Sequence, residues 1–446
     1  MSRVATPPGP RERIPGSTVV SFYRDPVGSL ARMAAEHGDV ARFRWGPRYE
    51  YLLNHPDLVE QVLVTQQRSF MKGQALQETK RILGDGLLTS EGALHLEQRR
   101  LMQRLFHRRR IAGYVEDMVA CADRLQRRWQ DGETCDVDEE MTRLTLAVVG
   151  RTLFATDVEG EAAEIGAALT DAMESLQRFM LPFYAALERL PLPSVRRLRA
   201  SRRRLDATIY RLIAARRDRP GGGDLLSLLL ETRDDEGRAM PETQVRDEAM
   251  TLFLAGHETT AVTLTWTWML LATHPEVERR LHAELDEVLG ARSPSADDLG
   301  RLDYTDMVLR ESMRLYPPAW LIGRRALVDV ELGAYVVPAG AVVLLSPWVT
   351  HRDGRFFADP SRFEPERWTP EDEAERPRFS YFPFGGGVRR CIGEPFALME
   401  AKVLLASIAR RWRLRLDPAQ RVEVLPRITL RPRYGMRMRL EARASR

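Results

Sequence analysis

A glycine-rich loop that carries a cysteine just ahead of a helix constrains this chain more than any other feature. The loop runs from Phe382 to Gly393, and three successive glycines at 385–387 precede Cys391. Because glycine has no side chain, such a backbone can approach a flat group closely. The helix expected from about Pro395 directs its positive end and free N–H groups toward the sulfur, which favours thiolate. The loop therefore predicts a reactive thiolate.

The other two cysteines, Cys121 and Cys135, are interpreted as small buried hydrophobic residues. An odd and sparse cysteine count argues against a disulfide framework and favours a reducing compartment. The sequence offers Cys391 no CxxC partner and no Cys/His set of the kind that binds zinc. A single thiolate in a glycine-rich loop suits haem iron, where it donates electron density that favours O–O cleavage.

The loop has the spacing Phe384-x-x-Gly387-x-Arg389-x-Cys391-x-Gly393, which resembles the haem-binding loop of the cytochrome P-450 family. The resemblance implies that Cys391 is the axial ligand to the iron of haem b. It also implies that Phe384 packs near the sulfur and that Arg389 pairs with a haem propionate. Gly393 permits the tight turn that follows the sulfur.

A long helix is predicted over Pro241–Thr273, and its apolar sequence contains Ala255, Gly256, Glu258 and Thr259. An acid and a hydroxyl are costly to bury unless they are paired. Taken alone, Thr259 is expected only to bond the preceding turn and bend the helix. The stretch is also similar to the acid–alcohol motif of the P-450 family. That resemblance implies that Ala255 and Gly256 lie against the haem, that Gly256 leaves room for dioxygen, that Thr259 bonds the oxygen and that Glu258 relays protons.

Further cations are candidates for binding the two haem propionates. His95 and Arg99 lie four residues apart on one predicted helix face, and a surface pair is the alternative interpretation. Arg324 matches the family's position five residues before Asp329, and Arg325 remains an alternative to it.

A charged set is expected to act as scaffold. Glu311 and Arg314 lie three residues apart, so both face one side of a helix. With Arg367 they resemble the structural triad of the P-450 family. The resemblance implies that the three side chains lock the loop that carries Cys391.

The resemblance covers nearly the whole chain and implies a mainly α fold with a minor β-rich part. A single domain is expected over residues 1–446, with a Pro-rich lead-in over 1–20, and haem buried between the long helix and the helix after Cys391. Helical periodicity dominates from about Leu94 to Met313. Strands are predicted at Asp39–Trp45, Tyr49–Leu53, Val328–Glu331, Val342–Leu345, Val422–Leu425 and Met436–Leu440.

Composition argues against two other classes of protein. A formal net charge of +4 over 446 residues is weak support for nucleic-acid binding, and the arginine runs lack the interleaved aromatic residues that a stacking platform needs. No stretch reaches the ~20 apolar residues of a membrane span, and the N-terminus has no apolar core typical of a signal peptide. We therefore expect a cytoplasmic monomer without a membrane anchor.

The resemblance implies a monooxygenase that hydroxylates or epoxidises a hydrophobic small molecule with O2. No reductase domain or Rossmann fingerprint is recognised, so two electrons are expected from a ferredoxin and its reductase or from a flavodoxin-type donor. A peroxide-driven peroxygenase is the enzymatic alternative, and a haem gas sensor is the non-enzymatic one. Glu258 and Thr259 argue against the peroxygenase, which would not need them, and no output domain of a sensor is recognised.

Bulky apolar residues are expected around the substrate. They suit a fatty acid, terpenoid, steroid or polyketide, and nothing in the sequence ranks these classes. The candidates for the pocket wall are Phe179, Phe183, Phe253, Trp320, Leu321 and Ile322.

Overall fold

The computed structural model describes residues 6–12, 14–154, 193–218, 221, 223–234 and 236–443. The chain forms two compact units, and each joins segments that are far apart in the sequence. The first unit consists of Met1–Glu78, Met313–Cys391 and Pro426–Leu430, and the second of Thr79–Ser312, Ile392–Leu425 and Arg431–Arg446. The expected single domain stays a prediction.

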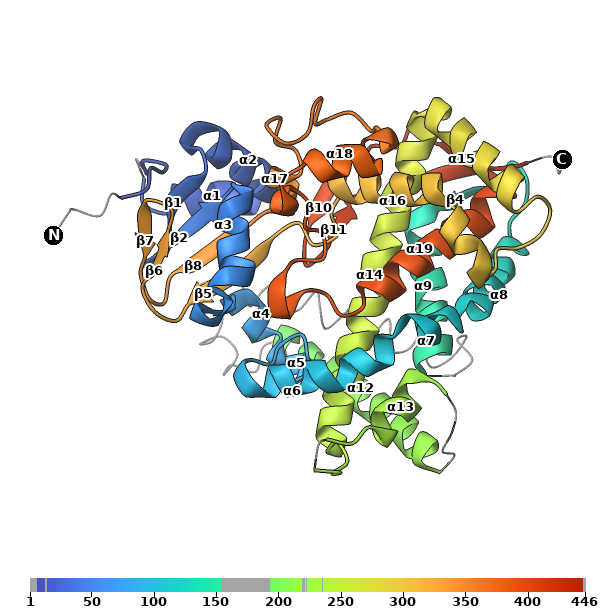
Figure 1. Cartoon of the computed structure of the whole chain (residues 1–446), viewed down its shortest axis with the longest axis horizontal. Coiled ribbons are helices and arrows are strands. Elements are labelled where there is room, and N and C mark those ends of the chain that lie inside the picture. The colour runs from blue at the N-terminus through green and yellow to red at the C-terminus, as the bar shows by residue number, and fades with distance from the viewer. Residues whose placement is uncertain are drawn as a thin grey trace. The chain divides into compact units, whose positions relative to one another are not determined.

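A five-stranded sheet organises the first unit, in the order β1-β2-β8-β5-β3 (Figure 1). Its strands are β1 Val40–Trp45, β2 Arg48–Leu53, β3 Phe70–Lys72, β5 Ile322–Ala326 and β8 Val342–Leu345. The other elements of this unit are α1 Ser17–Arg24, α2 Pro26–His37, α3 Pro56–Glu60, α4 Gln74–Glu78, the hairpin β6 Val330–Leu332 and β7 Tyr335–Val337, α17 Pro347–Thr350 and α18 Pro370–Glu375.

The predicted strands of this unit are confirmed, apart from a shift at one of them. The hairpin β1–β2 closes through the antiparallel pair Trp45 and Arg48. Strand β8 has the bounds that its apolar run predicts, and it is central, parallel to β2 and antiparallel to β5. Its Val343, Leu344 and Leu345 are all buried, so both faces of this central strand are covered, because successive side chains point to opposite faces. The strand expected at Val328–Glu331 begins two residues later, as β6.

Helices dominate the second unit. They are α5 Lys80–Leu83, α6 Gly92–Gln103, α7 Arg108–Ala112, α8 Val115–Gln126, α9 Val137–Phe154, α12 Pro193–Arg217, α13 Leu225–Glu231, α14 Glu242–Thr273, α15 Pro275–Val288 and α19 Glu394–Ala409. A three-stranded sheet in the order β4-β12-β9 contains β4 Thr134–Asp136, β12 Arg437–Ala442 and β9 Trp412–Leu416. Helix α16 Asp303–Leu315 continues from the second unit into the first, and β10 Val424–Pro426 pairs with β11 Leu430–Pro432.

Helix α14 is the predicted long helix, and it spans 32 residues. It begins one residue after the predicted start, with Pro241 as its N-cap, and it ends at Thr273 as predicted, with His274 as its C-cap just before Pro275. It packs against α9 and α19 (Figure 1). Buried threonines along it donate to carbonyls one turn earlier, such as Thr265 to Ala261 at 2.8 Å. Such bonds satisfy hydroxyl groups on a helix that is buried along most of its length.

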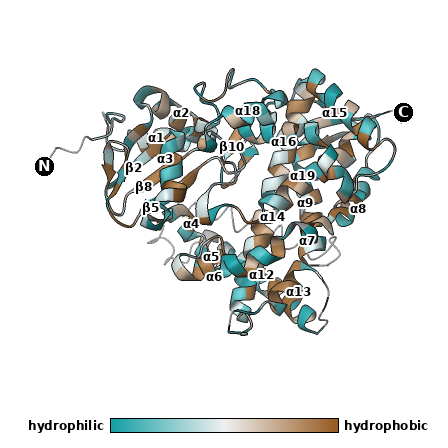
Figure 2. Cartoon of the chain, viewed as in Figure 1, coloured by the Kyte–Doolittle hydropathy of each residue, from teal (hydrophilic) through white to brown (hydrophobic). Residues whose placement is uncertain are grey.

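The core of the second unit forms where short apolar helices meet α14. The leucine-rich helix α13 stands out in brown in Figure 2. Its Leu225, Leu226 and Leu229 belong to the same buried cluster as Val245 and Phe253 of α14. Among the described residues, no helix is long and apolar enough to cross a membrane.

Candidate functional site

The loop before α19 closes on itself and presents its cysteine outward. The backbone N–H of Cys391 donates to the carbonyl of Phe384 at 2.9 Å, and that of Gly385 donates to Phe382 at 3.0 Å. Cys391 is exposed and lies three residues before α19, which begins at Glu394. The sequence therefore places a thiol at the rim of a hydrogen-bonded loop, just ahead of a helix N-terminus.

Two of the three glycines are required by contacts with the protein itself. A Cβ at Gly387 would lie 1.9 Å from the carbonyl oxygen of Leu63, and the residue has φ +64°. A Cβ at Gly386 would lie 2.6 Å from the Phe379 ring. The sequence analysis attributed the glycine run to a flat ligand, but at these two positions the close neighbour is the protein. The N–H of Val388 donates to Gln67 Oε1 at 2.8 Å, and this hydrogen bond also holds the glycine stretch in place.

A buried histidine connects Arg314 to the start of the loop. Arg314, fully buried, donates to the carbonyl of His351 at 2.8 Å, and the N–H of Phe382 donates to Nε2 of His351 at 3.0 Å. Burial lowers the pKa of His351 well below its usual value, and Arg314 and Arg352 add to the effect. Because the ring is neutral, Nε2 keeps the lone pair that accepts the Phe382 N–H. The sequence analysis missed His351.

Cations of the first unit gather around β3. Arg389 donates to the carbonyls of Gln67 at 3.1 Å and Phe70 at 2.9 Å. Two residues further along β3, Lys72 lies directly opposite Arg324 of β5 in the register of the two antiparallel strands. Both are buried, at 4% and 7% exposure, and directly paired residues of a sheet share one face.

This strand register distinguishes Arg324 from Arg325, the two alternatives that the sequence left open for binding a propionate. Successive side chains of a strand point to opposite faces, so Arg324 shares a face with Lys72 and Arg325 does not. Arg325 lies instead with its Nη2 3.0 Å from the sulfur of Met71. Lys72 was missed as a site residue, although a signal existed: it is one of only three lysines among 67 basic residues.

Helix α14 carries the predicted acid and hydroxyl in a half-buried stretch. Thr259 Oγ1 donates to the carbonyl of Ala255 at 2.9 Å, which is the helix-bending bond expected of Thr259 taken alone. Ala255 is exposed although the neighbouring Leu254 and His257 are buried. A Cβ at Gly256 would lie 3.0 Å from Val149 of α9. The missing side chain of Gly256 therefore permits close helix packing, and the open position on α14 is that of Ala255.

A family model described as Cytochrome P450 matches residues 7–435. The chain belongs to the cytochrome P450 family. It is 44% identical over 91% of its length to "Cyclooctatin synthase" of Streptomyces melanosporofaciens, covering 89% of that protein. It is 40% identical to "Cyclooctat-9-en-7-ol 5-monooxygenase" of the same species, over 90% of this chain and 87% of the relative. "Pentalenene oxygenase" of Streptomyces avermitilis is 39% identical, over 95% and 94%.

The fold agrees with that membership. The crystal structure of the cytochrome P450DA heme domain matches with a TM-score of 0.90 and 28% identity, over 99% of both chains. This P450 is thus an oxidoreductase of the monooxygenase type, mostly helical with small sheets, and it uses the haem of its family. The predicted family and fold class are confirmed.

The described residues fit a haem in their chemistry. A porphyrin with two carboxylates and an iron needs an axial donor, cations and an apolar wall. The first unit has an exposed thiol at Cys391 and the cations Arg389, Lys72 and Arg324 around one strand. In the second unit, Ala255 of α14 is exposed. The other two thiols are unsuited, because burial raises the pKa of Cys121 to about 11 and that of Cys135 to about 12.

His95 and Arg99 lie on α6 of the second unit. His95 is buried at 4% exposure, which rules out the exposed surface pair considered for it. Its Nδ1 lies 3.5 Å from the hydroxyl of Ser90, which in turn donates to Gln98 Oε1 at 2.5 Å. Arg99 is half-buried.

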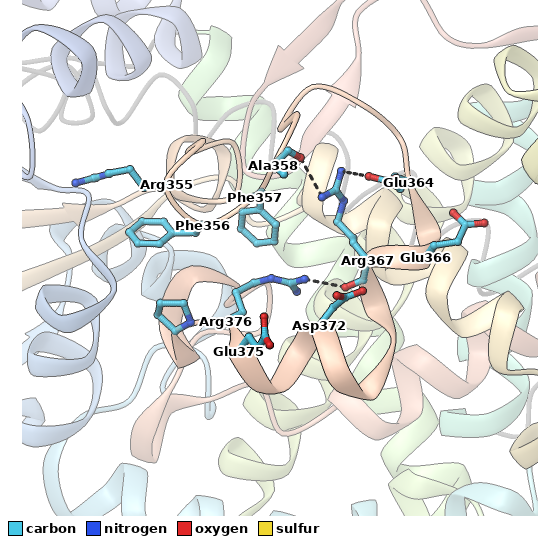
Figure 3. Close-up of a pocket in the computed structure, with 11 residues that line it drawn as sticks. Arg355, Phe356, Phe357, Ala358, Glu364, Glu366, Arg367, Asp372, Glu375 and Arg376 are labelled. Atoms are coloured by element: carbon cyan, nitrogen blue, oxygen red, sulfur yellow. Dashed lines mark hydrogen bonds and ion pairs between the residues drawn. The ribbon is translucent and has the colours of Figure 1, made fainter.

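Arg367 of the predicted triad lies in the first unit with Arg314. It pairs with Glu364 at 2.9 Å and donates to the carbonyl of Ala358 at 3.1 Å, at the wall of the surface pocket drawn in Figure 3. Glu311 is fully buried on the part of α16 that belongs to the second unit. Its role in the triad stays a prediction.

The candidates for the substrate wall separate into anchored and accessible residues. Phe253 is fully buried in the core of the second unit. Trp320 donates its indole N–H to the carbonyl of Arg427 at 2.8 Å. Leu321 and Ile322 are half-buried. Phe179 and Phe183 lie outside the described residues.

Proposed function

We propose that this P450 inserts oxygen into a cyclic terpene hydrocarbon or a terpene alcohol. The observation that carries the proposal is the similarity, at 39–40% identity over at least 90% of the chain, to a pentalenene oxygenase and to an enzyme named for oxygenating cyclooctat-9-en-7-ol. The half-buried Leu321 and Ile322 and the anchored Trp320 supply apolar surface for such a substrate.

Cys391 would bind the iron of haem b as thiolate, and Arg389, Lys72 and Arg324 would bind its propionates. We propose that His95 and Arg99 also bind these propionates. When bound, the haem supplies the activation of dioxygen, which a thiolate ligand promotes. Gly393 and Phe384 would shape the loop on either side of the sulfur.

Side chains of the protein are proposed to deliver the protons that the reaction consumes. The reaction consumes two protons, so a donor must connect the buried site with solvent. Thr259 donates its hydroxyl hydrogen to Ala255, which leaves the lone pairs of Oγ1 free to accept a hydrogen bond from a water. Glu258 is half-buried on the adjacent position and can exchange protons with bulk water. We assign Glu258 as the proton carrier and Thr259 as the residue that orients the last water.

Electrons are proposed to come from a separate ferredoxin-type or flavodoxin-type protein. The residues proposed to meet this donor are Arg104, Arg108 and Arg109, because a basic face would attract an acidic protein. Arg104 and Arg109 are exposed. The enzyme is proposed to act as a monomer.

The test is a titration of the haem-loaded protein with cyclic terpenes, fatty acids, steroids and macrolides, followed by the Soret band. A terpene that displaces water from the iron is expected to shift the band, and turnover with donor proteins should then give a product heavier by one oxygen atom. A shift with fatty acids or steroids alone would contradict the substrate class. Protein that binds no haem, or binds it without a thiolate spectrum, would contradict the role of Cys391.

A further inference from the structure

A buried hydrogen-bond network of the second unit ends at His95. Gln98, three residues further along α6, is only 2% exposed, and its Nε2 donates to the carbonyl of Asp85 at 2.7 Å. Its Oε1 accepts the hydroxyl of the fully buried Ser90 at 2.5 Å. The same Ser90 Oγ lies 3.5 Å from Nδ1 of His95. The Gln98 amide is therefore bound at both ends, and Ser90 connects it to the His95 ring.

The loop of residues 84–90, which contributes two members of this network, is fixed on α14. The N–H of Asp85 donates to Oδ2 of Asp247 at 2.7 Å. The N–H of Leu87 donates to Oε2 of the fully buried Glu248 at 2.9 Å. These bonds hold the loop backbone in place, and with it the carbonyl of Asp85 that the network uses.

The contacts decide which atoms of the network carry hydrogens. A carbonyl oxygen only accepts, so the end of the Gln98 amide at Asp85 is the NH2 group and the end at Ser90 is the oxygen. An amide oxygen also only accepts, so the single hydroxyl hydrogen of Ser90 points to Gln98. Toward His95, Ser90 Oγ therefore offers only lone pairs, and Nδ1, which faces it, carries a proton. Turning the hydroxyl toward Nδ1 would take its donor from the buried Oε1, which is costly.

A proton on Nδ1 restricts what the other ring nitrogen can do. In a neutral imidazole one nitrogen is a donor and the other an acceptor, whereas both are donors in the imidazolium ion. With Nδ1 protonated, Nε2 of a neutral His95 can only accept a hydrogen bond. It can donate to a carboxylate only when the ring holds both protons and is positively charged.

We propose that Gln98 is the positioning residue that acts through Ser90 to keep a proton on Nδ1 of His95, so that Nε2 donates to a haem propionate only as part of an imidazolium ion. The inference rests on the proposed role of His95 at a propionate. It makes the contact charge-assisted on both sides, and such hydrogen bonds are shorter and stronger than neutral ones. The negative propionate in turn favours the charged ring.

The elements that adjoin the network carry further charged groups, and none of the variants below changes them. Their effect on the His95 ring is therefore the same in each comparison. The groups next to His95 or bound to the loop are Lys80 and Asp85, Glu91 and Arg99 at α6, and Asp247 and Glu248 of α14.

The first test locates the ring protons without turnover. The protein is labelled with nitrogen-15 in histidine and loaded with ferrous haem and carbon monoxide, which makes it diamagnetic and suited to NMR. His95→Phe identifies the signals of His95. At low pH both ring nitrogens should be protonated, and as pH rises the neutral ring should keep its proton on Nδ1. A neutral wild-type ring with its proton on Nε2 would overturn the proposal.

Gln98→Met and Gln98→Glu form a matched pair for the same measurement. Both remove the NH2 group that donates to Asp85, but only glutamate still offers an oxygen to the hydroxyl of Ser90. In Gln98→Met that hydroxyl can turn and donate to Nδ1, so the neutral ring should move its proton to Nε2. In Gln98→Glu the proton should stay on Nδ1. The same proton position in both variants would show that Gln98 acts only in packing and would overturn the proposal.

Ser90→Ala keeps the proposal open to refutation if Gln98→Met does not bind haem. This variant deletes the oxygen beside Nδ1 of His95 and leaves Gln98 in place. The propionate should then draw the proton of the neutral ring to Nε2. A neutral ring that still holds its proton on Nδ1 would contradict a role of Ser90 and Gln98.

The second test follows haem transfer to apomyoglobin between pH 6 and 9. In the wild type the donor at Nε2 disappears when the His95 ring loses its second proton, so haem loss should become about tenfold faster as pH rises. In Gln98→Met the neutral ring can still donate from Nε2, so the rate should change much less with pH. Gln98→Glu should resemble the wild type. An identical pH profile in Gln98→Met and the wild type would overturn the proposal.

His95→Phe separates the two levels of inference. If it leaves haem loss unchanged at every pH, the proposed role of His95 at a propionate fails, and the positioning role of Gln98 fails with it. If His95→Phe accelerates haem loss while Gln98→Met has the wild-type ring protons and pH profile, only the positioning role fails and the proposed function stands.

Discussion

The carboxyl group of Glu400 on α19 lies beside the hydroxyl of Thr260 on α14, and both side chains are buried. Helix α19 follows the Cys391 loop, and Thr260 is adjacent to Thr259. Burial raises the pKa of Glu400 to about 8. The acid is therefore protonated at neutral pH, and it packs as a neutral group against α14, the helix that carries Glu258 and Thr259.

This protonation makes the stability of the P450 depend on pH. The folded-state pKa of about 8 lies above the usual 4.5, so the stabilisation is complete below pH 4.5 and is lost as pH rises toward 8. Glu400 should lower the free energy of unfolding by up to about 1.4 kcal/mol per pH unit in this window. Urea unfolding between pH 5 and 8.5 should show a flatter dependence for Glu400→Gln than for the wild type. Parallel curves would contradict a protonated Glu400.

Replacing His351 should loosen the cysteine loop. His351→Phe leaves the N–H of Phe382 buried without its acceptor, which costs about 1–3 kcal/mol. We expect faster haem loss, measured as transfer to apomyoglobin, and a lower unfolding temperature. The exposed His107 provides the control, because His107→Gln should leave both values unchanged. Wild-type haem loss in His351→Phe would show that the bond does not hold the loop.

Lys72 and Arg325 should differ in their effect on haem affinity. Lys72 shares a sheet face with Arg324, and loss of a charge-assisted hydrogen bond to a propionate costs about 1.5–3 kcal/mol. Lys72→Gln and Arg324→Gln should each speed haem loss by about tenfold or more. Arg325→Gln, on the opposite face, is the matched control and should have little effect. The reverse order would place the propionates on the other face.

Alanine at Gly387 should destabilise the first unit. The residue has φ +64°, and a Cβ would collide with the Leu63 carbonyl, so the strain should cost about 1–3 kcal/mol. Thermal unfolding and the fraction of haem incorporated on expression should both fall. Gly354→Ala is the control, since nothing lies within 4 Å of its Cβ. Equal stability of the two variants would remove the proposed reason for this glycine.

The features that the sequence predicted well are local. The spacing around Cys391 identified the family, because five fixed positions within ten residues define one loop. The bounds of α14 followed from Pro241 and Pro275, since proline permits a helix start and enforces a stop. The hairpin β1–β2 followed from alternating apolar residues. Hydrogen-bond geometry within a few residues determines each of these features, so a linear pattern records them.

Only the tertiary structure decided which distant side chains meet. Lys72 and Arg324 are 252 positions apart, and Arg431 reaches Asp138 across 293. No periodicity encodes such pairs, because strand register and helix packing bring them together. The same packing changed the reasons assigned to two glycines: Gly256 accommodates Val149 and Gly387 accommodates Leu63. The sequence by itself therefore determined the family and, with it, the haem cofactor, while packing determined which distant side chains meet; the roles of the reacting residues stay predictions.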